Sequence, residues 1–563
     1  MKRALVIVLA ICLSLGMFAG CGSKDEQSGK DQQSGTTAAV GSTTAAGGTT
    51  AVKSDMPDYL NAEEFPITKD KITLKMMGSK NPLNGEWKDM EVFKRMEALT
   101  NIGFEFDTPL ATGYVERKSL VFAGGDLPDV FLKGAITIQD EESFGSEMLQ
   151  PLEEYIEKYA PHIKKVLEEN PEVKNAITAT DGHIYTLPYI VRTKTAARNT
   201  MYMNTDWLQK VGMKIPATVD EFYQVLKAFK EKDPNGNNTA DEIALSYYKE
   251  ASPAASAAGL PSILDAIIYA AFSGQAGGSG FDIKDGKVTY NPIQPSFKEY
   301  LAYMNKLYTE KLLDPEMFTQ TQQQFTSKYK EGKMGISVLS LATVLNPGDP
   351  APYEILPPMT SSLNSKQVTA ELPGIYTGEF AISKNCKYPE AMIRWADVFY
   401  RTDDESVEGI SGLSTFLGIY DFNWHYTDST KKTYIRESKI ADVNPSDYII
   451  KAVVPGGFGW VATDAVADGD PLLLLKATES VKSYFPYTVS VYPTTVRFDK
   501  EQSDRLTFLQ GDINTYIEQM VAKFIIGAES LDNWDAYVNK LKQMNIDELT
   551  QIRQEAYDRW NKK

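Results

Sequence analysis

Hydrophobic and polar residues follow two different periods along this chain. Strict alternation over Lys71–Met77 predicts a β-strand, whereas Trp87–Thr100 carries apolar residues at the spacing of a helix. Short apolar clusters predict further strands at Gly103–Phe106, Leu127–Leu132, Ile184–Ile190 and Thr200–Asn204. Strands that alternate with helices are typical of an α/β fold with a parallel sheet.

Three longer segments have helical periodicity. Thr218–Lys232 starts with a capping box, Thr218 and Glu221, and then presents one apolar stripe. Pro151–Ile163 is expected to be a helix with Pro151 in its first turn. The tail Leu531–Trp560 predicts a long amphipathic helical region with a break near Met544–Asp547.

The N-terminus has the pattern of an export signal. Two basic residues precede an apolar run from Ala4 to Phe18, which at about 15 residues is shorter than a membrane span. Small residues then lead to Cys21, as in the bacterial lipobox, although Phe18 replaces the usual aliphatic residue. We expect a lipoprotein signal peptide at 1–20 and a lipidated, palmitate-bearing Cys21. An ordinary secretory signal and a retained membrane anchor are the alternatives.

The next segment predicts a flexible tether. Residues 21–56 are mostly Ser, Thr, Gly, Ala and Gln, and they lack the bulky apolar residues needed to offset the entropy of ordering. A chain of this kind has an rms reach of about 30–35 Å.

Composition narrows the function classes. The net charge of −17 provides no electrostatic footprint for nucleic acid, and anionic lipid head groups would repel the protein, so only the lipid would hold it at a membrane. After processing, Cys386 is the one cysteine besides Cys21, and an intramolecular disulfide is not expected. With three histidines and no recognisable catalytic motif, the sequence does not indicate an enzyme.

The segment 233–242 predicts a calcium site. Its alternating oxygen-bearing residues could wrap a hard cation, and the backbone carbonyl of Thr239 could add a further oxygen. The candidate ligands are Asp233, Asn235, Asn237, Thr239, Asp241 and Glu242. The loop departs from an EF-hand, since Asn238 stands where glycine is expected and Ala244 where the last glutamate is expected. An Asx-rich turn without metal is the alternative, and a bound Ca²⁺ is expected to be structural.

Several motifs resemble one family. They are Asp206–Leu208 with Val211–Gly212, Ile215–Phe222, the 233–242 loop, Gly124–Val130, Asp181–Pro188 and Trp534–Val538. Together they resemble extracellular solute-binding lipoproteins of carbohydrate ABC importers, family 1, including alginate- and oligosaccharide-binding proteins. The resemblance covers nearly the whole chain after the tether.

The resemblance implies a type II periplasmic-binding-protein fold, with two α/β lobes, a hinge and an interlobe cleft. We expect the N-terminal lobe to comprise 57–192 and 371–425. The C-terminal lobe, with the calcium loop, would comprise 199–370 and 426–563. The first crossing between lobes is expected at Val191–Asn199 and a return near Pro373–Ile382.

Aromatic and polar side chains are the expected sugar ligands, because a sugar's C–H face stacks on a flat ring while its hydroxyls need polar partners. The candidates are Trp87, Asp126, Tyr189, Arg192, Arg198, Trp424 and Trp460. Packing or turn capping is the alternative for each of the aromatic residues and for Asp126. A solvated hinge pair is the alternative for the two arginines.

The predicted function is a lipid-anchored, monomeric binding protein on the extracellular face of the cell membrane. It would deliver an oligosaccharide to an ABC permease pair by hinge closure. The sequence does not select the sugar's length, linkage or charge. A sugar-binding sensor or adhesin, and a surface glycoside hydrolase, are the alternatives.

Overall fold

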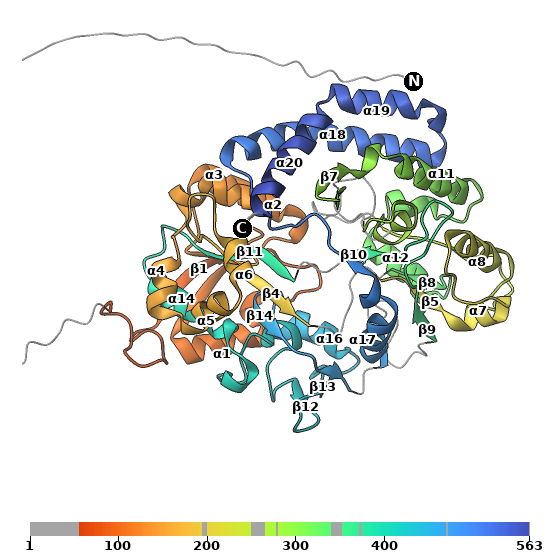
Figure 1. The fold of residues 1–563 in the computed structure, drawn as a ribbon. Helices are drawn as coiled ribbons and strands as arrows, with labels where there is room; N and C mark the ends of the chain where they lie inside the picture. The colour runs from red at the N-terminus through yellow and green to blue at the C-terminus, as the bar shows by residue number, and fades with distance from the viewer. Residues whose placement is uncertain are drawn as a thin grey trace, which may run out of the picture. The chain divides into compact units, whose positions relative to one another are not determined.

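Two β-sheets, each with its own hydrophobic core, organise the chain (Figure 1). The computed structural model describes residues 56–193, 200–248, 265–276, 280–338, 352–370, 374–468 and 471–561. Cys21, the 21–55 segment and Arg198 therefore lie outside the described residues. The described residues belong to one unit that begins at Met56.

The first lobe is built on a six-stranded mixed sheet with the order β14-β4-β11-β3-β1-β2. Strand β11 is antiparallel to both of its neighbours, and the other pairs are parallel. The strands are β1 (Ile72–Met77), β2 (Ile102–Asp107), β3 (Val130–Leu132), β4 (Leu187–Arg192), β11 (Ile375–Ile382) and β14 (Gly459–Ala462). Its helices are α1 (Glu91–Thr100), α2 (Ala111–Gly124), α3 (Ile138–Met148), α4 (Glu153–Tyr159), α5 (Pro161–Glu169), α6 (Pro171–Ile177), α14 (Pro389–Asp397), α15 (Ser414–Leu417) and α16 (Pro445–Tyr448). A small sheet, β12 (Trp424–Tyr426), β13 (Thr433–Arg436) and β15 (Val466–Ala467), packs beside β4 and β14.

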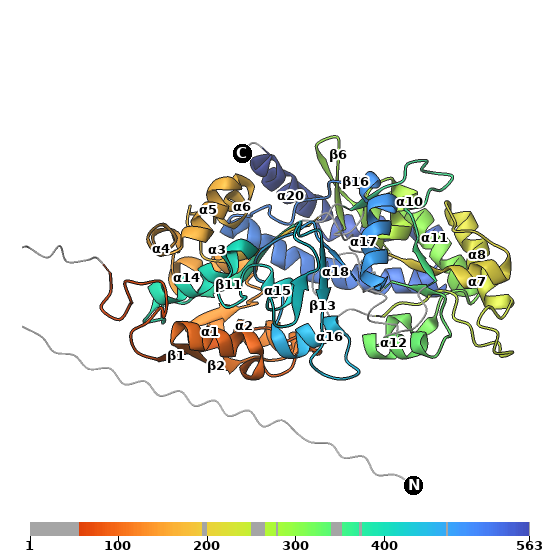
Figure 2. The ribbon, with the colours of Figure 1, turned by 90° about the horizontal axis from the view of Figure 1, so that it is seen from below.

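The second lobe has a three-stranded antiparallel sheet of β8 (Ile336–Ser337), β5 (Tyr202–Asn204) and β9 (Tyr353–Ile355). Helices supply most of its core, and Figure 2 shows those between residues 205 and 330 grouped together. The helices of this lobe are α7 (Thr205–Val211), α8 (Val219–Glu231), α10 (Ala270–Ser273), α11 (Pro295–Thr309), α12 (Gln322–Lys330), α17 (Pro471–Ser483), α18 (Lys500–Ile526), α19 (Trp534–Gln543) and α20 (Ile546–Trp560). Two strand pairs complete it: β6 (Phe281–Lys284) with β7 (Lys287–Tyr290), and β10 (Thr369–Ala370) with β16 (Thr488–Val489).

Most expected elements are present. The capping box at the start of α8 is formed, because Thr218 Oγ1 accepts the Glu221 N–H at 3.1 Å and Glu221 accepts the Thr218 N–H at 3.2 Å. The tail breaks between α19 and α20, where Asn545 adopts a left-handed conformation. The expected helix 151–163 is instead two helices. Helix α4 ends before Pro161 and α5 begins there, since proline lacks the N–H that a continuous helix needs.

The chain passes between the lobes three times. It leaves the first sheet after β4, returns between β10 and β11, and leaves again after β15. The expected boundary at 426 is therefore wrong. Strand β14 pairs with β4, and Tyr448 and Phe458 lie in the first hydrophobic core, so the first lobe extends to residue 468. Pairing between strands so distant in sequence leaves no local pattern.

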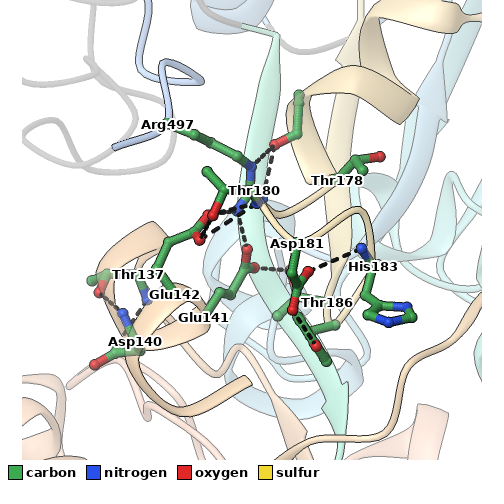
Figure 3. A network of polar contacts seen from close by, with 12 residues as sticks. Thr137, Asp140, Glu141, Glu142, Thr178, Thr180, Asp181, His183, Thr186 and Arg497 are labelled. Carbon is green, nitrogen blue, oxygen red and sulfur yellow. Dashed lines mark hydrogen bonds and ion pairs between the residues drawn. The ribbon is translucent and has the colours of Figure 1, made fainter. Parts of the chain in front are cut away.

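A buried ion-pair network joins the two lobes away from these passages (Figure 3). Arg497 precedes α18, which packs mainly on α11 and also contacts α3. Its guanidinium lies 2.6 Å from Glu141 and 3.3 Å from Glu142, both on α3, with side-chain exposures of 8%, 0% and 4%. It also donates two hydrogen bonds to the carbonyl of Ala176.

Each carboxylate in this network has a further donor. Glu141 accepts the Thr186 hydroxyl at 2.5 Å, and Glu142 accepts the backbone N–H of Thr180 at 3.1 Å. Burial raises the pKa of Glu141, and the charge of Arg497 opposes that shift. Arg497 is thus the cation that makes this acidic pair compatible with burial.

Candidate sugar site and calcium loop

Aromatic and cationic side chains gather where β4 ends in the first sheet. Tyr189 on β4 stacks on Tyr376 of β11, with ring centroids 5.7 Å apart and planes 29° apart. Three residues further on, the Arg192 guanidinium lies 6.0 Å from the Trp460 ring and forms an ion pair with Glu172 at 2.7 Å. The pairing of β14 with β4 sets these neighbours, because Trp460 lies opposite Ile190 and Ala462 opposite Arg192.

Three of the residues predicted from sequence, Tyr189, Arg192 and Trp460, lie near the end of β4, but on two faces of the sheet. Tyr189 packs with Tyr376 in the cluster around Trp424, whereas Trp460, beside Arg192, lies opposite Ile190 and packs against the main core of the first lobe. Ligands of open α/β sheets bind outside the carboxyl ends of the parallel strands, and Arg192 is the last residue of such a strand. Arg192 and Trp460 are both half-buried, so part of each remains accessible. A half-exposed ring beside a guanidinium can offer a stacking face and fixed donors to one ligand.

Trp424 lies close to this group but inside a core. Its side chain is 1% exposed, and its indole N–H donates to the Gly418 carbonyl at 2.9 Å. The ring shares a hydrophobic cluster with Tyr189 and meets Tyr434 edge to face at 6.2 Å. Trp424 is therefore packed in the same cluster as Tyr189 and presents no free ring face.

The structure separates the other two described candidates from this group. Trp87 is 1% exposed in the main core of the first lobe, where it stacks on Phe93 at 5.7 Å. Its other ring partner, Phe106, comes from β2, so the stretch Asn84-Gly85-Glu86-Trp87 does not by itself reveal this packing. Asp126 is exposed in the turn between α2 and β3.

The predicted calcium loop follows α8 and folds around its first acidic residue. The Asp233 carboxylate accepts backbone N–H groups of Gly236, Asn237 and Asn238 at 3.0, 3.1 and 2.9 Å. The Asn235 and Asn237 amides donate to Asp241 Oδ1 at 3.2 and 3.1 Å, and these hydrogen bonds lower the pKa of Asp241. Because an amide presents either NH₂ or oxygen by a half-turn, both asparagines could offer oxygens to a cation.

Glu242 is a buried carboxylate of this loop with one unsatisfied oxygen. Its side chain is 1% exposed and Oε1 has no hydrogen-bond donor. Burial raises its pKa, and the charges of Asp233 and Asp241 raise it further. A buried carboxylate in this situation is costly unless a cation compensates it, so the loop residues fit a hard cation. Nowhere in the described parts of the chain do three acidic, histidine or cysteine side chains form a ready metal cage, so amide and carbonyl oxygens would have to complete the coordination.

Comparison with known proteins identifies the family. The family profile described as "Bacterial extracellular solute-binding protein" matches residues 84–405, more than half of the chain. The chain belongs to this family. No helix in the described residues is long and apolar enough to cross a membrane.

This solute-binding protein is similar to several characterised relatives along nearly its whole length. It is 27% identical to the "Fructooligosaccharide ABC transporter substrate-binding protein FusA" of Streptococcus pneumoniae over 565 residues, 97% of this chain and 96% of FusA. The structure of FusA with kestose matches with a TM-score of 0.73 and 25% identity, covering 87% of this chain and 99% of that one. An "EF-hand mutant" of FusA with fructo-nystose matches with a TM-score of 0.72 and 23% identity, over the same shares of the two chains.

The alginate-binding protein AlgQ2, solved without calcium ion, has the same fold. Its TM-score is 0.67 at 24% identity, again over 87% of this chain and 99% of that one. These matches confirm the two-lobed type II periplasmic-binding-protein fold that the sequence motifs predicted.

Sequence reasoning missed two groups at the edge of the first sheet of this solute-binding protein. Tyr376 stacks on Tyr189 from β11. Glu379, on the same strand, lies opposite Lys133, which follows β3. A pattern search had no reason to select them, because these residues come together only through the antiparallel insertion of β11 between β3 and β4.

Proposed function

We propose that this protein captures an oligosaccharide outside the cell and delivers it to an ABC importer. The observation that carries the proposal is the Arg192–Trp460 pair at the end of β4, where a half-buried ring lies beside a cationic donor, with the Tyr189–Tyr376 stack on the other face of the same strand. Its full-length similarity to a fructooligosaccharide-binding protein supports the same ligand class.

Capture would proceed by closure of the two lobes over the sugar. Three chain passages link the lobes, and the Arg497 network holds α3 against the chain that leads into α18. The proposed first lobe is 57–192, 374–425 and the adjoining 426–468, with the remainder of the chain after the tether in the second. A ligand can close the lobes only by binding the closed state better than the open one.

We also propose that the 233–242 loop binds one structural Ca²⁺. Asp233, Asp241 and Glu242 would supply charge, while Asn235, Asn237 and the Thr239 carbonyl would supply neutral oxygens. The orphaned Glu242 oxygen supports this assignment, as does the presence of an EF-hand in FusA. The bound ion would fix the loop between α8 and the following chain.

Lipid on Cys21 and the 21–56 tether would keep the monomer on the extracellular face of the membrane, close to its permease pair. Tethering raises the effective concentration of the loaded receptor at the permease. The lipobox-like sequence at Cys21 supports this part of the proposal.

Isothermal titration with kestose, trigalacturonate and an alginate trisaccharide tests the proposal directly. We expect saturable binding of at least one sugar, a smaller radius of gyration in solution scattering when it is bound, and no cleavage products. Absence of binding to all three would refute the oligosaccharide assignment, and cleavage would favour a hydrolase. Binding that persists while a deletion strain still imports the labelled sugar would favour a sensor.

A further inference from the structure

A carboxylate without a hydrogen-bond donor in the described residues lies on β11, three residues beyond Tyr376. Glu379 is half-buried on β11, and within the described residues its carboxylate has no hydrogen-bond donor and no direct ion pair. The nearest cation acting on it is Lys133, the first residue after β3. Its position is fixed by the backbone, since the Gly134 N–H donates to the Glu379 carbonyl at 3.1 Å.

The backbone of β11 is distorted just before this residue. Its register with β4 shifts between Tyr376 and Phe380, which indicates a β-bulge. Gly378 has φ +76°, and a Cβ there would lie 1.8 Å from the Ile136 carbonyl oxygen, so only glycine fits. Bulges of this kind re-aim neighbouring side chains and are frequent beside functional sites.

Lys133 is held close to the loop that leads into β14. A Cβ on Gly457 would lie 3.1 Å from the Lys133 ammonium, and Gly457 itself has φ +56°. Lys133 therefore has Glu379 opposite it on β11 and the loop before β14 next to its ammonium.

The charges at this edge fit a neutral, hydroxyl-rich ligand. A carboxylate can accept two O–H groups on adjacent carbons, while an ammonium donates to hydroxyl or ring oxygens. A sugar acid would place its own carboxylate against Glu379, which costs energy when the site closes. Burial raises the pKa of Glu379 to about 7 and Lys133 opposes the shift, so the unliganded site holds this acceptor at some cost.

We propose that Glu379, with Lys133 opposite, binds two neighbouring hydroxyls of the sugar and selects neutral oligosaccharides over uronic-acid oligosaccharides. This assignment rests on the proposed function and names the charge class of its substrate. Glu379 acts as the specificity-determining acceptor, and the β11 bulge directs it.

The test is titration calorimetry with kestose and trigalacturonate at pH 8.5 and 5.5, using wild type, Glu379→Gln and Glu105→Gln. Glu105 is a matched control, because it is an exposed strand glutamate on β2 of the same sheet. At pH 8.5, Glu379→Gln should bind kestose about tenfold more weakly than wild type, because it lacks one charge-assisted acceptor. The kestose affinity of wild type should fall by a similar factor between pH 8.5 and pH 5.5, whereas that of Glu379→Gln should not change.

Three other titratable groups interact electrostatically with Glu379: Lys133, Tyr114 on α2 and Tyr400 after α14. Burial raises the pKa of both tyrosines, so both stay neutral throughout the range.

Each outcome separates the hypotheses. Equal kestose affinities and pH profiles for Glu379→Gln and wild type would overturn the Glu379 assignment while leaving sugar binding intact. Tighter wild-type binding of trigalacturonate than of kestose would do the same. A change only in thermal stability would reduce Glu379 to a structural residue. If wild type binds neither sugar, this inference fails, and the proposed function fails with it only if the alginate trisaccharide does not bind either.

Discussion

Replacing Arg497 with methionine should destabilise the protein well beyond an ordinary ion-pair mutation. Arg497→Met keeps the aliphatic bulk but leaves Glu141 and Glu142 buried without their cation. Removing one partner of a buried pair costs about 3–5 kcal/mol. We expect the lower end, about 3 kcal/mol, because Thr186 and Thr180 still donate to the two carboxylates.

Thermal unfolding of the ligand-free protein measures this loss. An unfolding unit of about 500 residues has an unfolding entropy of about 1 kcal/mol/K, so 3 kcal/mol corresponds to about 3 °C in Tm. Arg505→Met is the matched control. Its two-pronged pair with Glu548 also measures 2.6 Å, but the side chains are 37% and 41% exposed, and such pairs contribute under about 1 kcal/mol.

The pH dependence provides a second readout. Without Arg497, the already raised pKa of Glu141 should rise further, because the opposing charge is gone. A carboxyl group whose folded pKa lies above its unfolded value destabilises the fold as pH rises between the two. The deficit of Arg497→Met should therefore be larger at pH 8 than at pH 5. An Arg497→Met variant as stable as Arg505→Met at both pH values would refute the buried-pair reasoning.

Three further results are expected. Chelation should lower Tm in wild type and not in Asp233→Ala, and Glu242→Gln should be more stable than wild type in chelator, because its buried unpaired charge is gone; an unchanged wild-type Tm would remove the calcium assignment. Trp424→Ala should cost about 3–5 kcal/mol of stability, whereas Trp460→Ala should mainly weaken sugar binding in calorimetry; comparable stability losses would contradict this division. Cys21→Ser should release the protein into the medium on cell fractionation, and retention in the membrane would argue against the lipid anchor.

Local patterns made the helices predictable. The capping box at Thr218 and the apolar stripe that follows depend on residues within one or two turns, so the sequence alone sets α8. The break near Asn545 is equally local. The split at Pro161 is a local signal too, but the apolar spacing continues across the proline and so predicts a single helix.

Long-range strand pairing is the reason that the sequence did not predict the lobe boundary or distinguish the buried from the accessible site candidates. Strand β14 joins the first sheet from more than 260 residues beyond β4, and nothing around Gly459 reveals that partner. Trp424 and Trp460 both lie in glycine-bounded stretches, yet one is in a core and the other is half-buried beside Arg192. Only the assembled sheet distinguishes them.

Two carboxylates, Glu242 and Glu379, show how far chemistry can be inferred from sequence. Burial raises the pKa of both Glu242 and Glu379. Glu242 has Asp233 and Asp241 beside it, and three neighbouring carboxylates favour a bound cation. The alternating spacing of oxygen-bearing residues in that loop predicts the same cation from sequence. Glu379 has Lys133 beside it, so the two charges offset each other and the carboxylate favours a neutral hydrogen-bond donor. That second environment is made by β3, β11 and the loop at Gly457, and it exists only in the folded chain.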